Sequence, residues 1–577
     1  MNVIDRIIEV FSPSAALRRE EARWKLRTVK EFRNSGYDES GAARNKNSMR
    51  GWLASSKTPQ EDIDRNLPLL RQRSRSLFMS APLAVSAIKT NRTNIVGEGL
   101  KLKSSIDADF LGMTADEAAE WKRSAEREFE LWAQTKFCDS TRVNNFYEIQ
   151  QAACISWLMN GDACVLLEYD RPSKMLPYGI RIHLIESDRV STPYSGGNHV
   201  NLYAVDPDTK NRIFNGVEVD AKNRVVAYHI CSTHPNSNLY ARKEWKRVKA
   251  FGEKTGTPNV LMIYETERPE QYRGVPYLAP VIEALKQLTR YSEAEMMAAV
   301  INGFFTVFVT SEKGTSETGF TGVVDDEERL TDDDRHYELG PGMVNMLEPG
   351  EKIEIADAKR PSNNFDAFTT SLAKYVGAAL EIPVEILVKQ FTSSYSASRA
   401  ALLEAWKAFR MKRSWLAADF CQPVYEIFLT EAIAKGRLKA PGFFLDPMIR
   451  MAYCKAQWNG PAQGMIDPGK EVDAAEKRIN IGISTRQRET IEMTGGDFEA
   501  NVAQLERENQ LMKEAGLLSS KVENKPKKSE QESAEEDDEG DFSNTKIESE
   551  DKNDEDKKGN EGDSGDFTEA KRQSRKS

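Results

Sequence analysis

The sequence has few of the residues that build metal centres and covalent frameworks. It contains six cysteines and five histidines in 577 residues, and none of them forms a CxxC pair or another spacing typical of metal ligands. The cysteines stand at positions 138, 154, 164, 231, 421 and 454. Scattered thiols of this kind are typical of a reduced, intracellular protein. We therefore predict neither a metal nor a cofactor.

Long apolar runs are also missing. No stretch approaches the roughly 20 apolar residues that cross a bilayer, and no basic segment followed by an apolar one opens the sequence as in a secretion signal. We expect a protein that is made in a cytoplasm and has no membrane contact.

A strongly basic domain, the usual mark of a protein that clamps nucleic acid, is absent too. The net charge is −10, and residues 521–577 hold 19 acidic against 12 basic residues, so the rest of the chain is close to neutral. This balance argues against avid DNA binding and is compatible with DNA that only passes through. The acidic tail from 519 is too polar to offset its ordering entropy, and we predict that it is disordered.

One segment looks like the phosphate loop of ATPases but does not fit it. Residues 464–471, GMIDPGKE, satisfy the Gly-x4-Gly-Lys pattern. However, Glu471 replaces the Ser or Thr that binds magnesium, and Asp467 and Pro468 stand where backbone N–H groups should hold phosphate. We interpret the match as a coincidence.

Two other features are weak signs of catalysis. The acidic run at 325–334 is contiguous, whereas a nuclease site needs a few carboxylates fixed around one cation, so we predict a solvated loop. His229 alternates with apolar residues in an expected strand, which favours a hydrogen-bonded structural histidine over a metal ligand. The residues therefore predict a protein that is not an enzyme.

The pattern that dominates the sequence is a pair of long helices joined by a polar loop, at 361–420. Asn363 or Asn364 can cap the first helix, and Pro383 should break it. The polar run 390–396 predicts a loop, and from Ala397 the composition favours helix. The expected apolar faces comprise Phe365, Phe368, Leu372, Tyr375, Val376 and Ala379 in the first helix, and Leu402, Ala405, Phe409, Leu416 and Phe420 in the second.

The rest of the body has the mixed pattern of an α+β protein. Helices are expected at 61–98, 118–134, 147–158 and 273–302, and strands at 163–170, 180–186, 216–219, 225–231 and 304–310, with a strand, turn and strand at 342–358. The arginines of 61–98 favour pairing with carboxylates of this chain or of a neighbouring subunit over DNA contact. The small, Met-rich residues 294–305 suit either helices packed in a ring or an ordinary core helix.

Several segments, in this order, resemble the lambda-type portal protein family of tailed bacteriophages. They are RNLPLLRQRSRSLFMSAPLAVSAIKTNRTNIVGEGL from Arg65, NGDACVLL from Asn160, NGVEVDAKNRVVAYHI from Asn215 and RGVPYLAPVIEAL from Arg273. They continue with NNFDAF, ALEIPVEIL and YSASRAALLEAWKAF within 361–420, and with WNGPAQGMIDPGKEVDAAEKRINIGISTRQ from Trp458. The resemblance covers roughly residues 44–518.

The resemblance implies the portal fold, which assembles as a ring. Its expected parts are a partly flexible arm at 1–52, an α+β wing at 53–272, a stem helix at 273–303, a β-containing clip at 304–360 and a second stem helix at 361–387. A tunnel loop at 388–398, a long wing and channel helix at 399–440, a helical crown at 441–518 and the disordered tail at 519–577 complete the chain.

The implied function is structural: a ring of about twelve copies at one capsid vertex, through which double-stranded DNA is packaged and ejected. The implied partners are terminase, head-completion and tail-connecting proteins, and the major capsid protein, in the virion and in the host cytoplasm during assembly. We expect weak phosphate contacts from the loop residues Lys389, Gln390, Thr392, Ser393, Ser394, Tyr395 and Ser396. Two alternatives stay open: a DNA-processing enzyme whose site is unrecognised, and a bacterial structural protein without a viral role.

Overall fold

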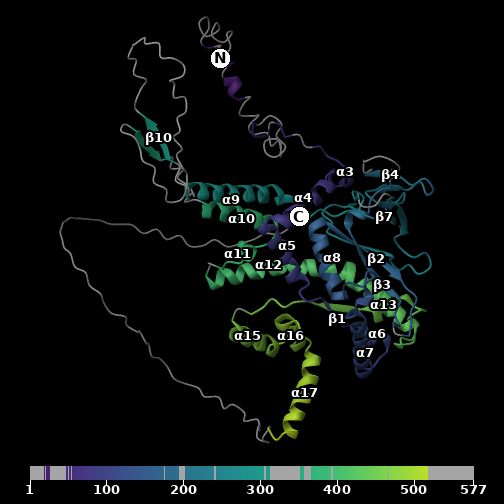
Figure 1. Cartoon of the computed structure of the whole chain (residues 1–577). Coiled ribbons are helices and arrows are strands. Elements are labelled where there is room, and N and C mark those ends of the chain that lie inside the picture. Colours follow the sequence, from purple (N-terminus) through teal and green to yellow (C-terminus); the bar gives the residue numbers. More distant parts are fainter. Residues whose placement is uncertain are drawn as a thin grey trace, which may run out of the picture. The chain divides into compact units, whose positions relative to one another are not determined.

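A computed structural model of the chain describes residues 55–174, 176–193, 202–238, 242–303, 307–311, 351–355, 365–391, 394–465 and 467–517, with a few short stretches before residue 53 (Figure 1). The chain divides into two units, Met1–Leu505 and Glu506–Ser577. The predicted cap at Asn363 or Asn364, the acidic run 325–334, the tail from 519 and nearly all of the arm lie outside the described residues.

The first unit begins with three helices, α3 (Pro59–Ile63), α4 (Leu67–Ser80) and α5 (Pro82–Ile95). We expected one helix over 61–98, but the chain is extended at Ala81, with φ −104° and ψ 114°. The cause is local, since the ring of Pro82 disfavours helical backbone at the preceding residue. Pro82 then opens α5, where a missing N–H costs nothing.

Two helices of the wing region form as predicted because both have side-chain caps. They are α7 (Ala115–Ala133) and α8 (Phe146–Asn160), preceded by the short α6 (Ala108–Leu111). Thr114 and Glu117 cap α7 reciprocally, and Asn145 and Glu148 do the same for α8, which satisfies N–H groups that the first turn leaves unpaired.

The described strands form small antiparallel sheets. One has the order β3-β2-β9 and another β4-β5-β6-β7-β8. Their bounds are β2 Asp162–Tyr169, β3 Ile180–Ile185, β4 Tyr203–Val205, β5 Arg212–Phe214, β6 Val217–Val219, β7 Val225–Cys231, β8 Trp245–Lys249 and β9 Val260–Tyr264. The predicted strands at 163–170, 180–186, 216–219 and 225–231 are confirmed within a residue or two. A further pair joins β1 (Lys101–Ser104) to β12 (Ala456–Asn459).

Two long helices flank a β hairpin. They are α9 (Ile282–Gly303) and α10 (Phe365–Ala379), and Figure 1 shows them side by side. Between them in sequence lie β10 (Val307–Ser311) and β11 (Glu351–Ile355), which pair antiparallel. The helix that we expected from residue 273 begins at Ile282, because residues 273–278 make other contacts, described below.

The chain then continues through α11 (Val384–Val388) and α12 (Tyr395–Leu416). The break at Pro383 is confirmed, and Ala405, Phe409, Leu416 and Phe420 are buried as predicted. The expected apolar face of α10 is different, since Phe368 is 50% exposed and Tyr375 is 65% exposed. The residues of α10 that are buried are Ala373, Val376 and Gly377.

After α12, a π-helical turn at Ala417–Cys421 leads into α13 (Gln422–Ala434). The remaining helices are α14 (Pro447–Cys454), α15 (Pro468–Asn480), α16 (Arg486–Thr494) and α17 (Phe498–Glu514). The described part of the second unit, 506–517, holds the end of α17 and the turn after it. Among the described helices, none is long and apolar enough to cross a bilayer.

The largest core surrounds the ring of Phe129. Four aromatic rings meet it edge to face, those of Phe146, Tyr425, Phe428 and Trp458, at centroid distances of 5.5, 5.6, 5.2 and 5.8 Å. This geometry is favourable beyond the burial of area. Phe443 and Tyr453 belong to the same core, so residues on both sides of α14 pack with the body. All six cysteines are buried and unpaired.

Candidate functional site

The predicted channel loop begins with a helix end that fixes its direction. Lys389 terminates α11 in the left-handed conformation, with φ 57°. The N–H of Gln390 donates to the Glu385 carbonyl at 3.0 Å, as in a Schellman-type cap. Lys389 and Gln390 are exposed, and so is Phe391, which we did not include among the site residues.

The loop ends earlier than the sequence suggested, because α12 begins at Tyr395. Thr392 and Ser393 lie outside the described residues. Ser394 caps α12, its hydroxyl accepting from the Ala397 N–H at 3.4 Å. Tyr395 and Ser396, expected in the loop, form the first turn of that helix. Both are exposed, and Tyr395 accepts a hydrogen bond from Arg399 at 3.1 Å.

The segment that carries the loop is attached to the body at three places. Ser86 of α5 donates to the Leu387 carbonyl at 2.6 Å. Arg399, one turn into α12, pairs with Glu471 of α15 at 3.1 Å. The third attachment joins α10 and α12: Lys412 is almost fully buried and its ammonium lies 2.9 Å from Glu381.

The backbone at Glu381 is itself unusual, because this residue is left-handed with φ 53°. The preceding carbonyl, that of Leu380, accepts from the Tyr277 hydroxyl. The Lys412 ammonium lies 5.2 Å from the centre of the Tyr277 ring. Tyr277, which precedes α9, and Lys412 of α12 therefore hold the end of α10. The position of the chain that leads to the loop is fixed by these contacts.

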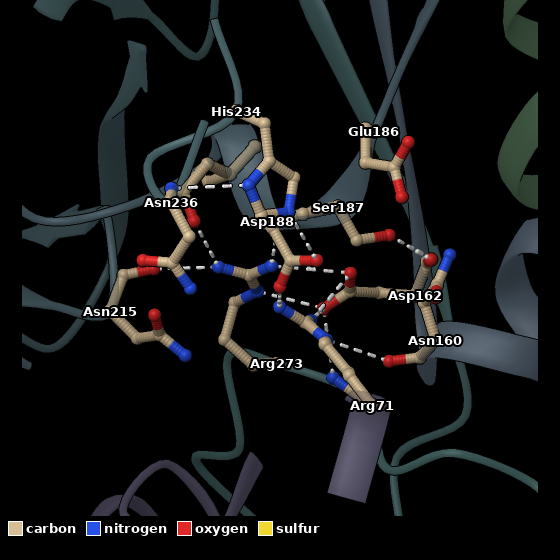
Figure 2. Close-up of polar contacts among 12 residues, drawn as sticks. Arg71, Asn160, Asp162, Glu186, Ser187, Asp188, Asn215, His234, Asn236 and Arg273 are labelled. Carbon is tan, nitrogen blue, oxygen red and sulfur yellow. Dashed lines mark hydrogen bonds and ion pairs between the residues drawn. The ribbon is translucent and has the colours of Figure 1, made fainter. Parts of the chain in front are cut away.

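Arg273 lies four residues before Tyr277 and forms a buried cluster of ion pairs with Asp162 and Arg71 (Figure 2). The carboxylate of Asp162 binds Arg71 at 2.8 and 2.9 Å and Arg273 at 2.7 and 3.2 Å. Burial alone would raise the pKa of Asp162, but the two guanidinium groups outweigh it and hold the pKa below its ordinary value. One carboxylate thus joins α4, β2 and the segment that leads to α9.

Backbone carbonyls accept hydrogen bonds from other N–H groups of the two arginines. Arg273 donates to the carbonyls of Val190, Asn215 and Ser187 at 2.7, 2.6 and 2.8 Å, and Arg71 donates to that of Asn160 at 2.8 Å. Asp188 adds a second carboxylate, 3.3 Å from Arg71. Planar guanidinium groups suit such convergent acceptors. The pairing predicted for the arginines of 61–98 is confirmed within the chain for Arg71 and Arg75.

Two glycines allow the cluster to close. Gly161 has φ 92°, and a Cβ there would overlap the Gly274 carbonyl, just as one on Gly274 would overlap the Gly161 carbonyl. The two backbones therefore touch. Sequence reasoning missed the cluster, although the segments NGDACVLL and RGVPYLAP, which supply Gly161, Asp162, Arg273 and Gly274, were both among those that carried the resemblance.

A partly buried arginine, Arg413, joins two other segments of the resemblance. Arg413 donates to the carbonyls of Ile95, Asn94 and Pro461 at 3.0, 2.8 and 2.9 Å. Burial lowers its pKa to about 10, so the guanidinium stays charged at neutral pH. A Cβ on Gly460 would lie 2.8 Å from Arg413 Nε, which explains the glycine. Arg413 links α12 to both sides of the β1 and β12 pair.

One group of side chains has the composition of a metal site but is already satisfied by hydrogen bonds. Asp206, Glu218 and His229 bring potential ligand atoms within 4.8 Å of one another. However, Glu218 accepts from Arg247 at 2.7 and 2.9 Å and from His229 at 3.2 Å. Donors from Thr209 and Asn211 also reach it. The structural role predicted for His229 fits this network.

The segment that resembled a phosphate loop has other contacts. The side chain of Asp467 caps α15, accepting from the Lys470 N–H at 3.4 Å. A carboxylate thus occupies the helix end where a phosphate would bind, and Glu471 binds Arg399. These contacts support the interpretation of the pattern as a coincidence.

The family model and the curated relatives agree on one family. The family model described as "Phage portal protein, lambda family" matches residues 45–413. The chain is 24% identical over 488 residues to the portal protein of Escherichia phage N15, covering 81% of this chain and 89% of that protein. It is also 24% identical over 514 residues to portal protein B of Escherichia phage lambda, covering 85% and 92%. Among solved structures, a chain from the neck of a native GTA particle computed with C12 symmetry matches with a TM-score of 0.38 and 13% identity, covering 74% of this chain and 92% of that one.

Proposed function

Because the chain belongs to the lambda family of phage portal proteins, we propose that about twelve copies form a ring at one capsid vertex. Double-stranded DNA passes through this ring during packaging and ejection. The observation that carries the proposal is the family match over residues 45–413. Native mass and negative-stain images of the purified protein test it. A ring with a central hole is expected, and a compact dimer with magnesium-dependent activity on DNA would overturn it.

We place the narrowest part of the channel at residues 388–398. The features that support this are an exposed Lys389, an adjacent polar Gln390 and a backbone fixed at both ends by α11 and α12. In a cyclic ring, any residue that faces the axis recurs once per subunit. Lys389 would then form a collar of positive charge around the duplex.

A collar with one lysine per subunit is suited to DNA that moves through the channel, not to DNA that is held there tightly. Each phosphate that a cation neutralises strengthens binding through counterion release, so a channel lined by many cations would stall the DNA. A single lysine with hydroxyl and amide neighbours from Gln390 and Ser394 gives a weak contact. It does not read bases, because phosphates carry no sequence information.

The substitution Lys389→Glu tests the role of the collar. Both residues have a similar backbone preference, so the change alters charge and leaves the left-handed helix end in place. We expect shorter packaged DNA or a several-fold lower yield of filled particles, measured by the length of DNA recovered from purified particles. The matched control is Lys222→Glu, an exposed lysine in the turn between β6 and β7.

An unchanged DNA length in the Lys389→Glu variant would remove this residue from the mechanism and leave the ring proposal intact. A loss in both variants would point to a general effect of charge on assembly.

The partners follow from the same role. We propose that terminase docks on the ring during packaging, and that head-completion and tail-connecting proteins dock there afterwards. The hairpin of β10 and β11, between the long helices α9 and α10, supports a clip at the end of a two-helix stem. The wing at 53–272, which supplies Arg71 and Asp162 of the buried cluster, would face the major capsid protein.

This role is structural, and we infer that the protein is not an enzyme. It would be assembled in the host cytoplasm and remain in the virion at the capsid vertex. Since Phe443 and Tyr453 pack in the central core, we propose that the crown begins after Asn459, not at residue 441.

A further inference from the structure

One face of α9 is exposed from Lys286 to Val300, and its side chains change from charged to apolar along this stretch. Lys286, Arg290, Glu293, Met297 and Val300 follow one another at steps of four, three, four and three residues, and all are exposed. Such spacing places them on one side of a helix. Met297 is 61% exposed and Val300 is 53% exposed. We call this set the α9 stripe.

The stripe is not covered by its neighbour α10. That helix packs on α9 through another face, where the Tyr291 ring stacks on Phe365 at 5.4 Å and meets Phe368 edge to face at 4.9 Å. A helix normally buries its apolar positions against another layer. The described residues of this chain provide no such layer for Met297 and Val300, which are both exposed.

The same chain has an apolar groove of about 520 Å3 on a different set of elements. It lies between the end of α10, the start of α11 and the middle of α12. The small and apolar side chains that line it are those of Ala378, Ile382, Pro383, Val384, Ala408 and Met411. A methionine can fill an irregular apolar groove of this kind well, because its side chain is unbranched and flexible.

We propose that the groove receives the α9 stripe of the next subunit in the ring. This inference rests on the proposed ring, and it names the surfaces that form the ring contact. A closed ring uses a heterologous interface, in which one surface patch meets a different patch on the neighbour. The α9 stripe and the groove are such a pair, since one is a ridge, the other is concave, and they lie on different elements.

The charges of the two surfaces are compatible. The rim of the groove carries Lys374, Lys407, Glu381 and Glu404, and the stripe carries two basic residues and one acidic residue. Within the chain, Glu404 pairs with Lys407 at 2.6 Å and Glu381 pairs with Lys412 at 2.9 Å. A register that places Glu293 beside Lys374 brings opposite charges together and leaves both of these pairs intact. Rim charges of this type set register and specificity more than affinity, so the apolar ridge supplies the affinity.

Cysteine crosslinking in the full-length ring tests the contact. The double variant Met297→Cys with Ala408→Cys is treated with a short bismaleimide, and the products are separated on a denaturing gel. Since the six native cysteines are buried, they contribute little background. We expect a ladder of covalent dimers and higher multiples, which each single variant lacks. The control pair is Met297→Cys with Lys222→Cys.

Three outcomes would be decisive against the inference or its premise. A ring of the expected mass whose crosslinking equals the control pair overturns the contact and leaves the ring proposal standing. A crosslink that forms only within one chain, without a ladder, overturns the contact as well. If the protein forms no ring under any condition, this result contradicts the proposed function itself.

A second variant measures the importance of the groove for assembly. Ala408→Trp fills the groove, and we expect the fraction of protein in rings to fall at least tenfold while circular dichroism stays unchanged. The matched control is Ala400→Trp, an exposed position two turns earlier on α12, which should assemble normally. Normal assembly of a folded Ala408→Trp variant would contradict the inference. If that variant does not fold, the crosslinking result decides.

Discussion

The buried cluster around Asp162 and the exposed loop around Lys389 use charge in opposite ways. In the cluster, two guanidinium groups share one carboxylate, and carbonyl oxygens accept from their other N–H groups. In the loop, a single ammonium group stands at a helix end and faces solvent. The cluster satisfies its charges internally, whereas the loop keeps a charge available to a passing molecule. Substitutions in the cluster are therefore expected to change stability, and substitutions in the loop are expected to change function.

The largest effect should come from removing the shared carboxylate. Asp162→Ala would leave Arg71 and Arg273 charged and buried, and breaking such a pair typically costs about 3–5 kcal/mol. Urea unfolding of the body, or soluble yield if the variant does not fold, measures the loss. Glu244→Ala is the control, since Glu244 pairs with Arg242 at 2.8 Å and both side chains are exposed. A surface pair is worth about 0–1 kcal/mol, so an equal loss in both variants would refute the central place of Asp162.

The contact between the two glycine backbones gives the next effect. Gly161→Ala places a methyl group against the Gly274 carbonyl at a left-handed position, and we expect a loss of about 2–4 kcal/mol from overlap and strain together. Gly436→Ala has a similar φ of 71° but nothing within 4 Å, so only the conformational cost of about 1 kcal/mol remains. Thermal unfolding of both variants separates overlap from backbone strain. Equal losses would show that the close approach is unimportant.

A third test uses pH and another buried carboxylate, that of Glu218. Burial would raise the pKa of Glu218, but hydrogen bonds from Arg247, Asn211 and Thr209 lower it to about 2. A group with a lowered pKa stabilises the fold above its ordinary pKa near 4.5, and this contribution, up to about 3 kcal/mol, is lost as pH falls toward 2. Glu218→Gln should flatten that part of the stability curve. An unchanged slope between pH 5 and pH 2 would contradict the assignment.

The smallest effect is expected in the loop. Lys389→Gly relieves the cost of a left-handed lysine, and we expect stability to stay equal or to rise by up to about 1 kcal/mol, while the charge that we assign to DNA contact is lost. Unfolding curves together with the length of packaged DNA test both halves of the prediction. A marked loss of stability would show that Lys389 is part of the body, which would break the contrast between the two regions.

Local patterns predicted much of the fold because many elements are fixed by their own residues. Capping boxes at Thr114 and Asn145 and the break at Pro383 could be found in the sequence, and so could the alternating strands at 180–186 and 225–231. The start of α9 was predicted too early. Pro276 and Pro280 disfavour helix before Val281, a local signal that the prediction did not use. The ion pair of Arg273 with Asp162, more than 100 positions earlier, leaves no local signal.

The candidate site shows a similar limit. The sequence indicated a polar loop after α11, but Ser394 caps α12 and therefore places Tyr395 and Ser396 in the helix. The apolar positions Phe368 and Tyr375 suggested a buried face of α10, yet both are exposed. A helical period shows that a face is apolar, but it does not show whether the same chain or another copy covers it.

The pairing of β1 with β12 has a consequence for the synthesis of the protein. Lys101 lies opposite Asn459, so the two strands are separated by roughly 350 residues of sequence. At translation rates of about 5–20 residues per second, β1 waits on the order of 20–70 s for its partner to be made. Until then Leu102 and its neighbours have an open edge, to which another nascent chain can add a strand. The body can close only late in synthesis, when nearly all of the chain that carries α9 and the loop has already been made.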